Sequence, residues 1–176
     1  MAAAPANASA SPHAEPRQRI AVIGLGSIGG AVAGCLVAAG RHHVVACTRE
    51  PIERLTLESP AGTAELPLAA LTDPAQVAEP ADWVMLCTKT HQTAATAPWL
   101  SRLCTPATRV AVLQNGIGHV ERVAPLANGA AVLPAIVYFT GERLAPDRVR
   151  MRQGSEPDIA VTDDEAGRGF ASLFAG

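Results

Sequence analysis

The sequence predicts an α/β protein with a mostly parallel sheet, helices on both faces of that sheet and a hairpin extension. Three observations support this fold class. Short apolar runs alternate with helical segments from residue 20 onward, which is the pattern of strand–helix–strand units. A glycine-rich turn directly follows the first apolar run. After residue 131 the apolar runs are short and are separated by Gly, Pro and Asp, as in hairpins.

The length and composition suit one globular domain. The chain has 176 residues, of which 48% are apolar and 17% charged, so it can bury a core of ordinary size. Its formal net charge of −2 offers no basic surface for a nucleic acid, and we expect no such partner. We assign residues 19–176 to the domain. Residues 1–18, rich in Ala, Pro and Ser, are expected to form a disordered tail.

An uncharged run over residues 20–40 has the length of a membrane span. Its Gly26, Gly30 and Gly34 are spaced like a helix-dimerisation face, and a signal peptide is another interpretation of the run. However, six of the 21 residues are Gly, which would weaken a continuous helix. The run also divides into a short strand and a helix. We therefore expect no membrane span.

The elements of the first 130 residues follow from apolar runs and their punctuation. The first strand covers 20–23, and the helix over 31–39 ends at Gly40, a typical C-terminal stop. Pro51 is expected to open a short helical segment, because Pro is tolerated at the first position of a helix. The remaining predictions, in chain order, are strands over 43–48, 64–68, 82–87 and 109–113 and helices over 91–103 and 118–126.

From residue 131 the pattern changes from alternating strands and helices to strands alone. Residues 131–140, 148–152 and 158–161 are predicted strands, separated by turn residues. We expect them to form a hairpin-rich extension that closes the sheet. Asp163 then begins a last, weak helix.

The glycine-rich turn joins the first strand to the first helix. In a Rossmann-type domain the first Gly makes the tight turn, the second lets the backbone approach a pyrophosphate, and the third lets helix and strand pack closely. The N-terminus of the helix then offers free N–H groups and a partial positive charge to the phosphates. We predict a dinucleotide site formed by the six residues of this turn, Gly24, Leu25, Gly26, Ser27, Ile28 and Gly29.

The end of the second strand indicates which dinucleotide binds. A domain specific for NAD usually has an acidic residue there, which binds the ribose 2′-hydroxyl. This strand ends instead in Cys47-Thr48-Arg49, and a guanidinium suits a 2′-phosphate. We therefore predict NADP as the cofactor. The alternative is that Arg49 is a solvated charge and that Glu50 binds the ribose.

Lys89 is the only lysine among 14 basic residues. Its setting, Cys-Thr-Lys-Thr, excludes a Walker A loop, and no lysine follows Tyr138 to form a Tyr-x-x-x-Lys pair. Lys89 and Asn115 each come just after a predicted strand, so both are expected at the carboxyl edge of the sheet, where ligands bind. The alternatives are a solvated lysine at a helix start and an Asn that tolerates a left-handed turn.

The cysteines predict neither a metal site nor a disulfide framework. Cys35, Cys47, Cys87 and Cys104 are scattered, with no Cys-x-x-Cys spacing and no pair of His residues at ligand spacing. We expect them to be small core residues in a protein of a reducing compartment, the cytoplasm.

With these features the sequence resembles the ketopantoate reductases (2-dehydropantoate 2-reductases) over residues 19–176. The matching parts are the glycine-rich turn, Arg49, the run Lys89-Thr90-His91-Gln92 and the run Gln114-Asn115-Gly116. The resemblance implies NADPH-dependent reduction of a 2-keto acid, ketopantoate to pantoate, in pantothenate biosynthesis. It also implies the role of each residue. The turn would hold the pyrophosphate and Arg49 the 2′-phosphate, Lys89 would lie near the nicotinamide ribose and substrate, Asn115 would hydrogen-bond to both, and Thr140 would contact the cofactor.

The sequence departs from the family in one respect. Family members have a second, helical domain, which supplies a catalytic lysine as proton donor, but no lysine follows Lys89 here. The resemblance therefore implies the cofactor-binding half of the enzyme, completed by a helical domain in cis or by a homo-oligomer. We expect this half to bind NADPH and to reduce ketopantoate very slowly or not at all. Two alternatives stay open: a stand-alone nucleotide-binding module without catalysis, and a related beta-hydroxyacid or imine reductase.

Overall fold

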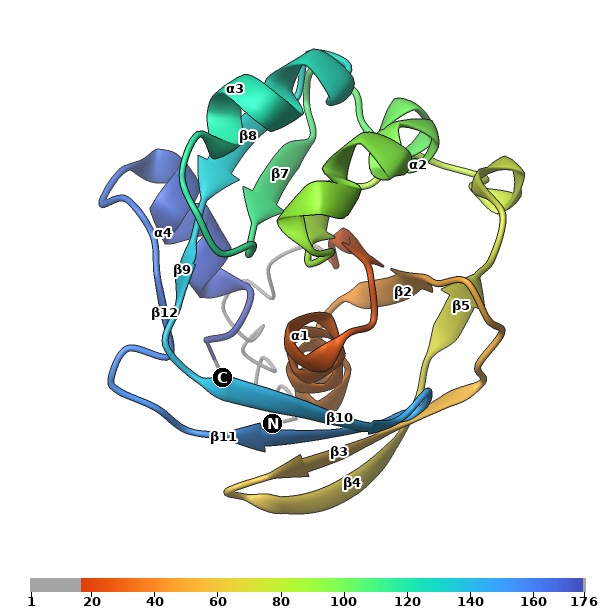
Figure 1. Ribbon diagram of the computed structural model, residues 1–176, viewed down its shortest axis with the longest axis vertical. Coiled ribbons are helices and arrows are strands. Elements are labelled where there is room, and N and C mark those ends of the chain that lie inside the picture. The colour runs from red at the N-terminus through yellow and green to blue at the C-terminus, as the bar shows by residue number, and fades with distance from the viewer. Residues whose placement is uncertain (1–16, 176) are drawn as a thin grey trace, which may run out of the picture.

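The computed structural model describes residues 17–175, in which two β-sheets lie on opposite sides of the helix α1 (Ser27–Ala39) (Figure 1). The predicted tail over 1–18 lies outside the described residues apart from Arg17 and Gln18. The uncharged run over 20–40 divides, as predicted, into β1 (Arg19–Ile23), a turn and the 13-residue α1. Within residues 17–175, no helix has the length and apolar character that crossing a membrane requires.

The larger sheet is parallel throughout, in the strand order β5-β2-β1-β6-β7-β8. Besides β1, its strands are β2 (His43–Cys47), β5 (Ala69–Leu71), β6 (Trp83–Leu86), β7 (Arg109–Val112) and β8 (Ala131–Pro134). From β1 the chain builds the sheet outward, first to one side and then to the other. The carboxyl ends of β1 and β6 therefore form the switch point at which such sheets bind ligands.

Helices cover both faces of this sheet, which confirms the predicted fold class. α1 and α4 (Glu165–Ser172) lie on one face, and α2 (Ala97–Leu103) and α3 (His119–Val123) lie on the other. Successive residues of β1 point to opposite faces. Ile20 and Val22 join the cluster on the α1 side, whereas Ala21 and Ile23 join the cluster on the α2 side. A strand buried on both faces needs a continuous apolar run, and β1 has one.

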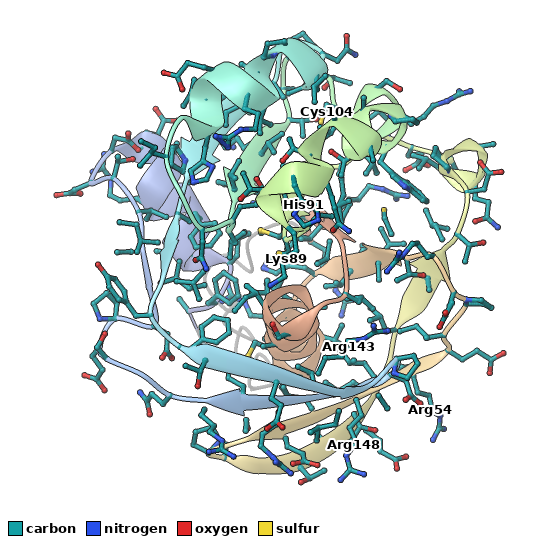
Figure 2. All side chains as sticks on the ribbon, in the orientation of Figure 1. Arg54, Lys89, His91, Cys104, Arg143 and Arg148 are labelled. Carbon is teal, nitrogen blue, oxygen red and sulfur yellow. The ribbon has the colours of Figure 1, made fainter. Side chains whose placement is uncertain are left out.

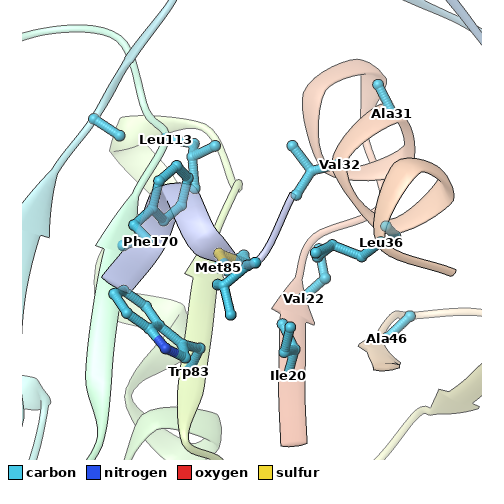
Figure 3. Close-up of a cluster of buried hydrophobic side chains, with 14 of the residues drawn as sticks. Ile20, Val22, Ala31, Val32, Leu36, Ala46, Trp83, Met85, Leu113 and Phe170 are labelled. Atoms are coloured by element: carbon cyan, nitrogen blue, oxygen red, sulfur yellow. The ribbon is translucent and has the colours of Figure 1, made fainter. Parts of the chain in front are cut away.

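The core on the α1 side is mostly aliphatic and includes a few aromatic side chains, among them Trp83 and Phe170 (Figure 3). Val32 and Leu36 of α1 belong to the same cluster as Val22, and all three are at most 2% exposed. Trp83 of β6 packs edge-on against Phe170 of α4, with 5.9 Å between the ring centroids. This contact fixes α4 on the sheet, because burying a large apolar side chain stabilises a fold by roughly 1.5–3 kcal/mol.

The second sheet has four strands in the order β10-β11-β3-β4. Its strands are β3 (Arg54–Ser59), β4 (Gly62–Pro67), β10 (Thr140–Ala145) and β11 (Arg148–Arg152). β3 and β11 pair in parallel, and the other two pairs are antiparallel. The small elements are β9 (Ile136–Val137), which pairs with β12 (Ile159–Ala160), and the 3-10 helices η1 (Pro74–Gln76), η2 (Thr90–Thr96) and η3 (Ala124–Leu126).

Two glycines of α1 let the second sheet pack closely on the helix. A Cβ at Gly30 would lie 3.2 Å from the side chain of Val149, and one at Gly34 would lie 2.9 Å from that of Leu57. The glycine spacing that resembles a membrane-helix motif is thus used for contact with a sheet. Because α1 is enclosed by two sheets, its outward face is apolar and small rather than charged.

Three predictions about the elements are wrong. Pro51 opens no helical segment: residues 51–53 lead directly into β3, where Leu55 and Leu57 alternate with polar residues and are buried under α1. The hairpin does not close the large sheet, because β10 pairs with β11 and β11 pairs with β3 to build the second sheet. The predicted strand over 131–140 is broken into β8, β9 and the start of β10.

Two further differences are smaller. The predicted helix over 91–103 begins as the 3-10 helix η2 and becomes α-helical only from Ala97. The edge strand β5 has three residues, which is too short to give a sequence pattern, and none was predicted over 69–71.

Candidate cofactor-binding site

A cleft of about 520 Å³ opens at the carboxyl ends of β1, β2 and β6. Its walls come from the glycine-rich turn, the connection after β2, the residues from Cys87 to Trp99 and the turn between β10 and β11. Figure 2 labels Lys89 and Arg143, which line this cleft from two different sheets. A larger hollow, of about 900 Å³, runs along β2 and β5. None of the predicted site residues lines that hollow, so the predicted chemistry belongs to the smaller cleft.

The glycine-rich turn has a distinct constraint at each glycine. Gly24 has a left-handed φ of 92°, and its N–H donates to the carbonyl of Cys47 over 3.1 Å, which ties the turn to β2. A Cβ at Gly29 would lie 2.0 Å from the carbonyl oxygen of Gly24. A Cβ at Gly26 would have no neighbour within 4 Å. The first and third glycines are therefore required by packing, whereas Gly26 leaves open space above its backbone.

The N-terminus of α1 points its unpaired groups toward this space. Gly26 is the N-cap, with no side chain to cap the helix, and the first turn contains no acidic residue. The first N–H groups of a helix have no partner within it. Such a terminus favours an anion. Open space over Gly26 and an uncapped helix are what the pyrophosphate of a dinucleotide needs, so the residues present fit that group.

Arg49 lies where the sequence predicts it, in the connection after β2 and on the wall of the cleft. The hydroxyl of Thr48 donates to the carbonyl of Glu50 over 2.7 Å, and this bond shapes the turn around Arg49. Arg49 and Glu50 are both exposed and both line the cleft. Neither forms an ion pair with another residue in the described part of the chain. Both the predicted NADP site and its alternative, a ribose bound by Glu50, thus have their side chain in place.

Lys89 is exposed on the cleft wall after β6 and precedes η2. Its backbone N–H donates to the side-chain oxygen of Gln92 over 3.3 Å, and the N–H of Gln92 donates to the carbonyl of Lys89 over 2.8 Å. These two bonds fix the backbone of Lys89 and leave its ammonium group on the cleft side, without an ion pair to any described residue.

The side chain of Gln114, which follows β7, is hydrogen-bonded to the segment that follows β6 and contains Lys89. It is 5% exposed, and its amide nitrogen donates to the hydroxyl of Thr88 over 3.0 Å. The same amide lies 3.1 Å from the hydroxyl of Thr93. Buried polar groups of this kind are costly to leave unpaired. Gln114 thus holds Thr88, the neighbour of Lys89, in position.

Asn115 lies beside this network but does not line the cleft. Its carbonyl accepts a hydrogen bond from the hydroxyl of Thr90 over 2.8 Å, so it is tied to the residue after Lys89. Within residues 17–175 the only non-glycine residue with positive φ is Asn128, whereas Gly116 and Gly118 have φ of 112° and 68°. The alternative explanation, that Asn115 serves a left-handed turn, is therefore wrong.

Thr140, the first residue of β10, also lies outside the cleft lining, and its predicted cofactor contact stays a prediction. Its neighbour Gly141 packs against the glycine-rich turn, since a Cβ there would lie 2.4 Å from the carbonyl oxygen of Ser27. Arg143 and Trp99 also line the cleft and were not predicted. Trp99 stands in the predicted helix after Lys89, and its place in the chain could have indicated it. Arg143 had no such signal.

The cysteines are all free thiols. Burial raises the pKa of Cys47, Cys87 and Cys104 to about 12, and it also raises the pKa of Cys35. Cys87 lines the cleft, but a protonated thiol is a poor nucleophile. Among residues 17–175, no three His, Cys, Asp or Glu side chains come together in a group that could hold a metal ion.

Comparison with known proteins identifies the family. The model of the family described as "Ketopantoate reductase PanE/ApbA" matches residues 20–163. The chain belongs to this family. Its parallel sheet, glycine-rich turn and cleft are thus those of a ketopantoate reductase family domain, and the resemblance inferred from the sequence is confirmed.

Relatives in the ketopantoate reductase family are longer than the region that aligns with this chain. A 2-dehydropantoate 2-reductase of Caulobacter vibrioides is 41% identical over 156 residues, and one of Mycobacterium tuberculosis is 38% identical over 158 residues. Both alignments cover 89% of this chain but only 53% and 52% of the relatives. The chain spans about half the length of the curated relatives it matches.

Solved structures of the same family share the fold. The 2-dehydropantoate 2-reductase of Geobacter metallireducens superposes with a TM-score of 0.76 at 24% identity, and a PanE/ApbA family ketopantoate reductase of Ralstonia eutropha with 0.75 at 25%. Each covers 89% of this chain, which in turn covers 54% and 53% of theirs. A ketopantoate reductase of Staphylococcus aureus, described as dimeric, has a TM-score of 0.71.

Proposed function

We propose that this chain is the NADP-binding half of a reductase that converts a 2-keto acid, ketopantoate, to its 2-hydroxy acid, pantoate. One observation carries the proposal: the open backbone at Gly26 and the guanidinium of Arg49 line the same cleft at the switch point of the sheet. A pyrophosphate fits the first, and a 2′-phosphate fits the second. Membership of the ketopantoate reductase family supports the substrate class.

In this proposal each residue of the turn has its own role. Gly24, Leu25, Gly26, Ser27, Ile28 and Gly29 hold the pyrophosphate through the backbone. Gly24 makes the turn, Gly29 brings the helix against it, and Gly26 leaves room for the phosphates. Arg49 binds the 2′-phosphate through paired charge-assisted hydrogen bonds.

Lys89 and Asn115 act on the substrate side. NADPH, when bound, supplies the hydride. Lys89 brings a positive charge to the cleft wall, where it attracts the carboxylate of a 2-keto acid and opposes the negative charge that develops on the carbonyl oxygen. Asn115, tied to Thr90 beside Lys89, offers its side-chain amide to the cofactor and the substrate.

The proton that completes the reduction needs a further group. Lys89 is the only lysine in the 176 residues, so a proton donor of the kind that the family uses must come from another segment or from a partner chain. The half coverage of the relatives supports a helical domain as its source.

The experiment that tests the cofactor assignment is Arg49→Ala, with NADPH and NADH affinities measured by fluorescence titration. Loss of a charge-assisted contact should weaken NADPH binding about 10- to 100-fold. NADH binding should change less than about threefold, because it has no 2′-phosphate to lose. Arg102→Ala is the matched control, since Arg102 is exposed on α2 and does not line the cleft. Equal losses for the two nucleotides would defeat the assignment.

A further inference from the structure

Arg143 is a second arginine on the cleft wall, and the family resemblance gives it no role. It lies on β10, in the second sheet (Figure 2). It lines the same cleft as Arg49, which follows β2 of the first sheet. Of the 13 arginines in residues 17–175, ten form an ion pair or a side-chain hydrogen bond. Within residues 17–175 only Arg49, Arg102 and Arg143 form neither, and two of these three line the cleft.

The register of the second sheet directs Arg143 to the inner face. Cross-strand partners share a face, and Arg143 pairs with Val149, whose side chain packs on α1. Glu142 pairs with Arg150 on the opposite face, where its carboxylate lies 3.4 Å from the Arg150 guanidinium. The alternation of side chains along β10 therefore places Glu142, which has an ion pair, on the outer face and Arg143, which has none, on the inner face. The strand pairing shifts register directly after Arg143, between Arg143 and Ala145, and an extra residue at such a shift re-aims the neighbouring side chains.

Two contacts fix β10 in relation to the rest of the cleft. Gly141, two residues before Arg143 on the same face, packs against the carbonyl of Ser27 in the glycine-rich turn. At the other end of β10, the carbonyl of Asp147 accepts a hydrogen bond from the N–H of Thr56 over 2.7 Å. Thr56 belongs to β3, which the chain enters directly from the connection that carries Arg49. Arg143 is thus held between the glycine-rich turn and β3, the strand that follows the Arg49 connection.

The charges of the lining favour an anion at this place. Arg49, Lys89 and Arg143 line the cleft against one carboxylate, that of Glu50. We propose that Arg143 and Arg49 together hold the 2′-phosphate of NADP, so that Arg143 is a second determinant of specificity for NADP over NAD. This inference rests on the proposed function. A guanidinium from each sheet would then contact one phosphate, whose three free oxygens can accept from both.

The test uses Arg143→Ala in the 176-residue chain and four probes: NADPH, NADH, adenosine 2′,5′-bisphosphate and AMP. Calorimetric affinities should fall about tenfold or more for the two probes with a 2′-phosphate, and less than about threefold for the two without it. Arg143→Lys should recover only part of the loss, because lysine lacks the planar fork. Arg102→Ala is the matched control and should change none of the four. Circular dichroism of each variant confirms that it folds.

The outcomes separate this inference from the function on which it rests. If the unmodified chain binds NADPH no better than NADH, the NADP assignment fails and the inference with it. If Arg49→Ala removes the preference but Arg143→Ala leaves it intact, the assignment stands and the inference is overturned. A loss in Arg143→Ala that is equal for all four probes also overturns it, since Arg143 would then act on the adenosine 5′-phosphate that all four share or on the fold.

Discussion

Gly29 lies directly against the carbonyl oxygen of Gly24, so close that a Cβ at Gly29 would be 2.0 Å from it. This contact joins the first turn of α1 to the end of β1 and sets the position of the loop between them. Gly26, in the same loop, has no neighbour within 4 Å of its Cβ position. The two glycines therefore serve different purposes, one in packing and one in binding.

Alanine at these two positions should separate stability from binding. We expect Gly29→Ala to lower the free energy of unfolding by about 1–3 kcal/mol or more, because the backbone must move apart. Gly26 has φ −78°, which Ala adopts, so Gly26→Ala should stay within about 1 kcal/mol of the unmodified chain. It should nevertheless weaken NADPH binding tenfold or more, since its methyl group fills the space of the pyrophosphate. Denaturant unfolding and NADPH titration measure the two effects. Unimpaired NADPH binding by Gly26→Ala would contradict this role.

The buried cysteines should be nearly inert in the folded protein. Burial raises the pKa of Cys47, Cys87 and Cys104 to about 12. At pH 8 their reaction with iodoacetamide should therefore be at least ~100-fold slower than that of the same thiols in guanidinium chloride. Mass spectrometry of the alkylated peptides gives the rate at each site. A rate at Cys87 like that of a free thiol would show that the thiolate is accessible in the cleft.

The same thiols make stability depend on pH. In the unfolded chain a thiol has a pKa of about 8.5, so below that pH both states are protonated and the contribution is constant. Between about 8.5 and 12 the unfolded state loses its protons first, and the free energy of unfolding falls as pH rises. Melting temperatures should therefore decrease from pH 8.5 to pH 10. A Cys47→Ala, Cys104→Ala double variant should show a shallower decrease, and an unchanged slope would refute the explanation.

The 176-residue chain alone should reduce ketopantoate far more slowly than ordinary enzymes, whose turnover is ~1–1000 per second. Lys89 supplies a positive charge at the cleft, but no second lysine is present to donate the proton. Loss of NADPH absorbance with ketopantoate, corrected for the rate without it, measures the turnover. Lys89→Met should abolish whatever rate remains. A rate of several per second for the unmodified chain would disprove the need for a further proton donor.

The parallel sheet could be predicted because its strands are buried on both faces. Runs such as 20–23 and 110–112 are apolar throughout, and their burial follows from that composition. The carboxyl-edge positions of Arg49 and Lys89 then followed from strand order alone. The second sheet could not be predicted in the same way. β3 pairs with β11 across more than 90 residues of chain, and no local sequence pattern predicts that pairing.

The positions of several cleft residues could be predicted from the large sheet, whereas that of Arg143 depends on the second sheet. The residues of the glycine-rich turn, Arg49 and Lys89 all belong to the large sheet and to its loops. Arg143 reaches the cleft only because the β10–β11 hairpin folds across α1. The helical segment predicted at Pro51 is wrong for a related reason. A proline at the first position of a helix is common, but here the alternating Leu55 and Leu57, buried under α1, make the segment a strand.

The most direct test of the account is the affinity of the unmodified chain for NADPH and for NADH, measured by calorimetry under the same conditions. If the cleft at the carboxyl ends of β1 and β2 is an NADP site, NADPH should bind at one site per chain. Its affinity should be at least about tenfold higher than that of NADH. No binding of NADPH, or equal affinities for the two nucleotides, would contradict the account.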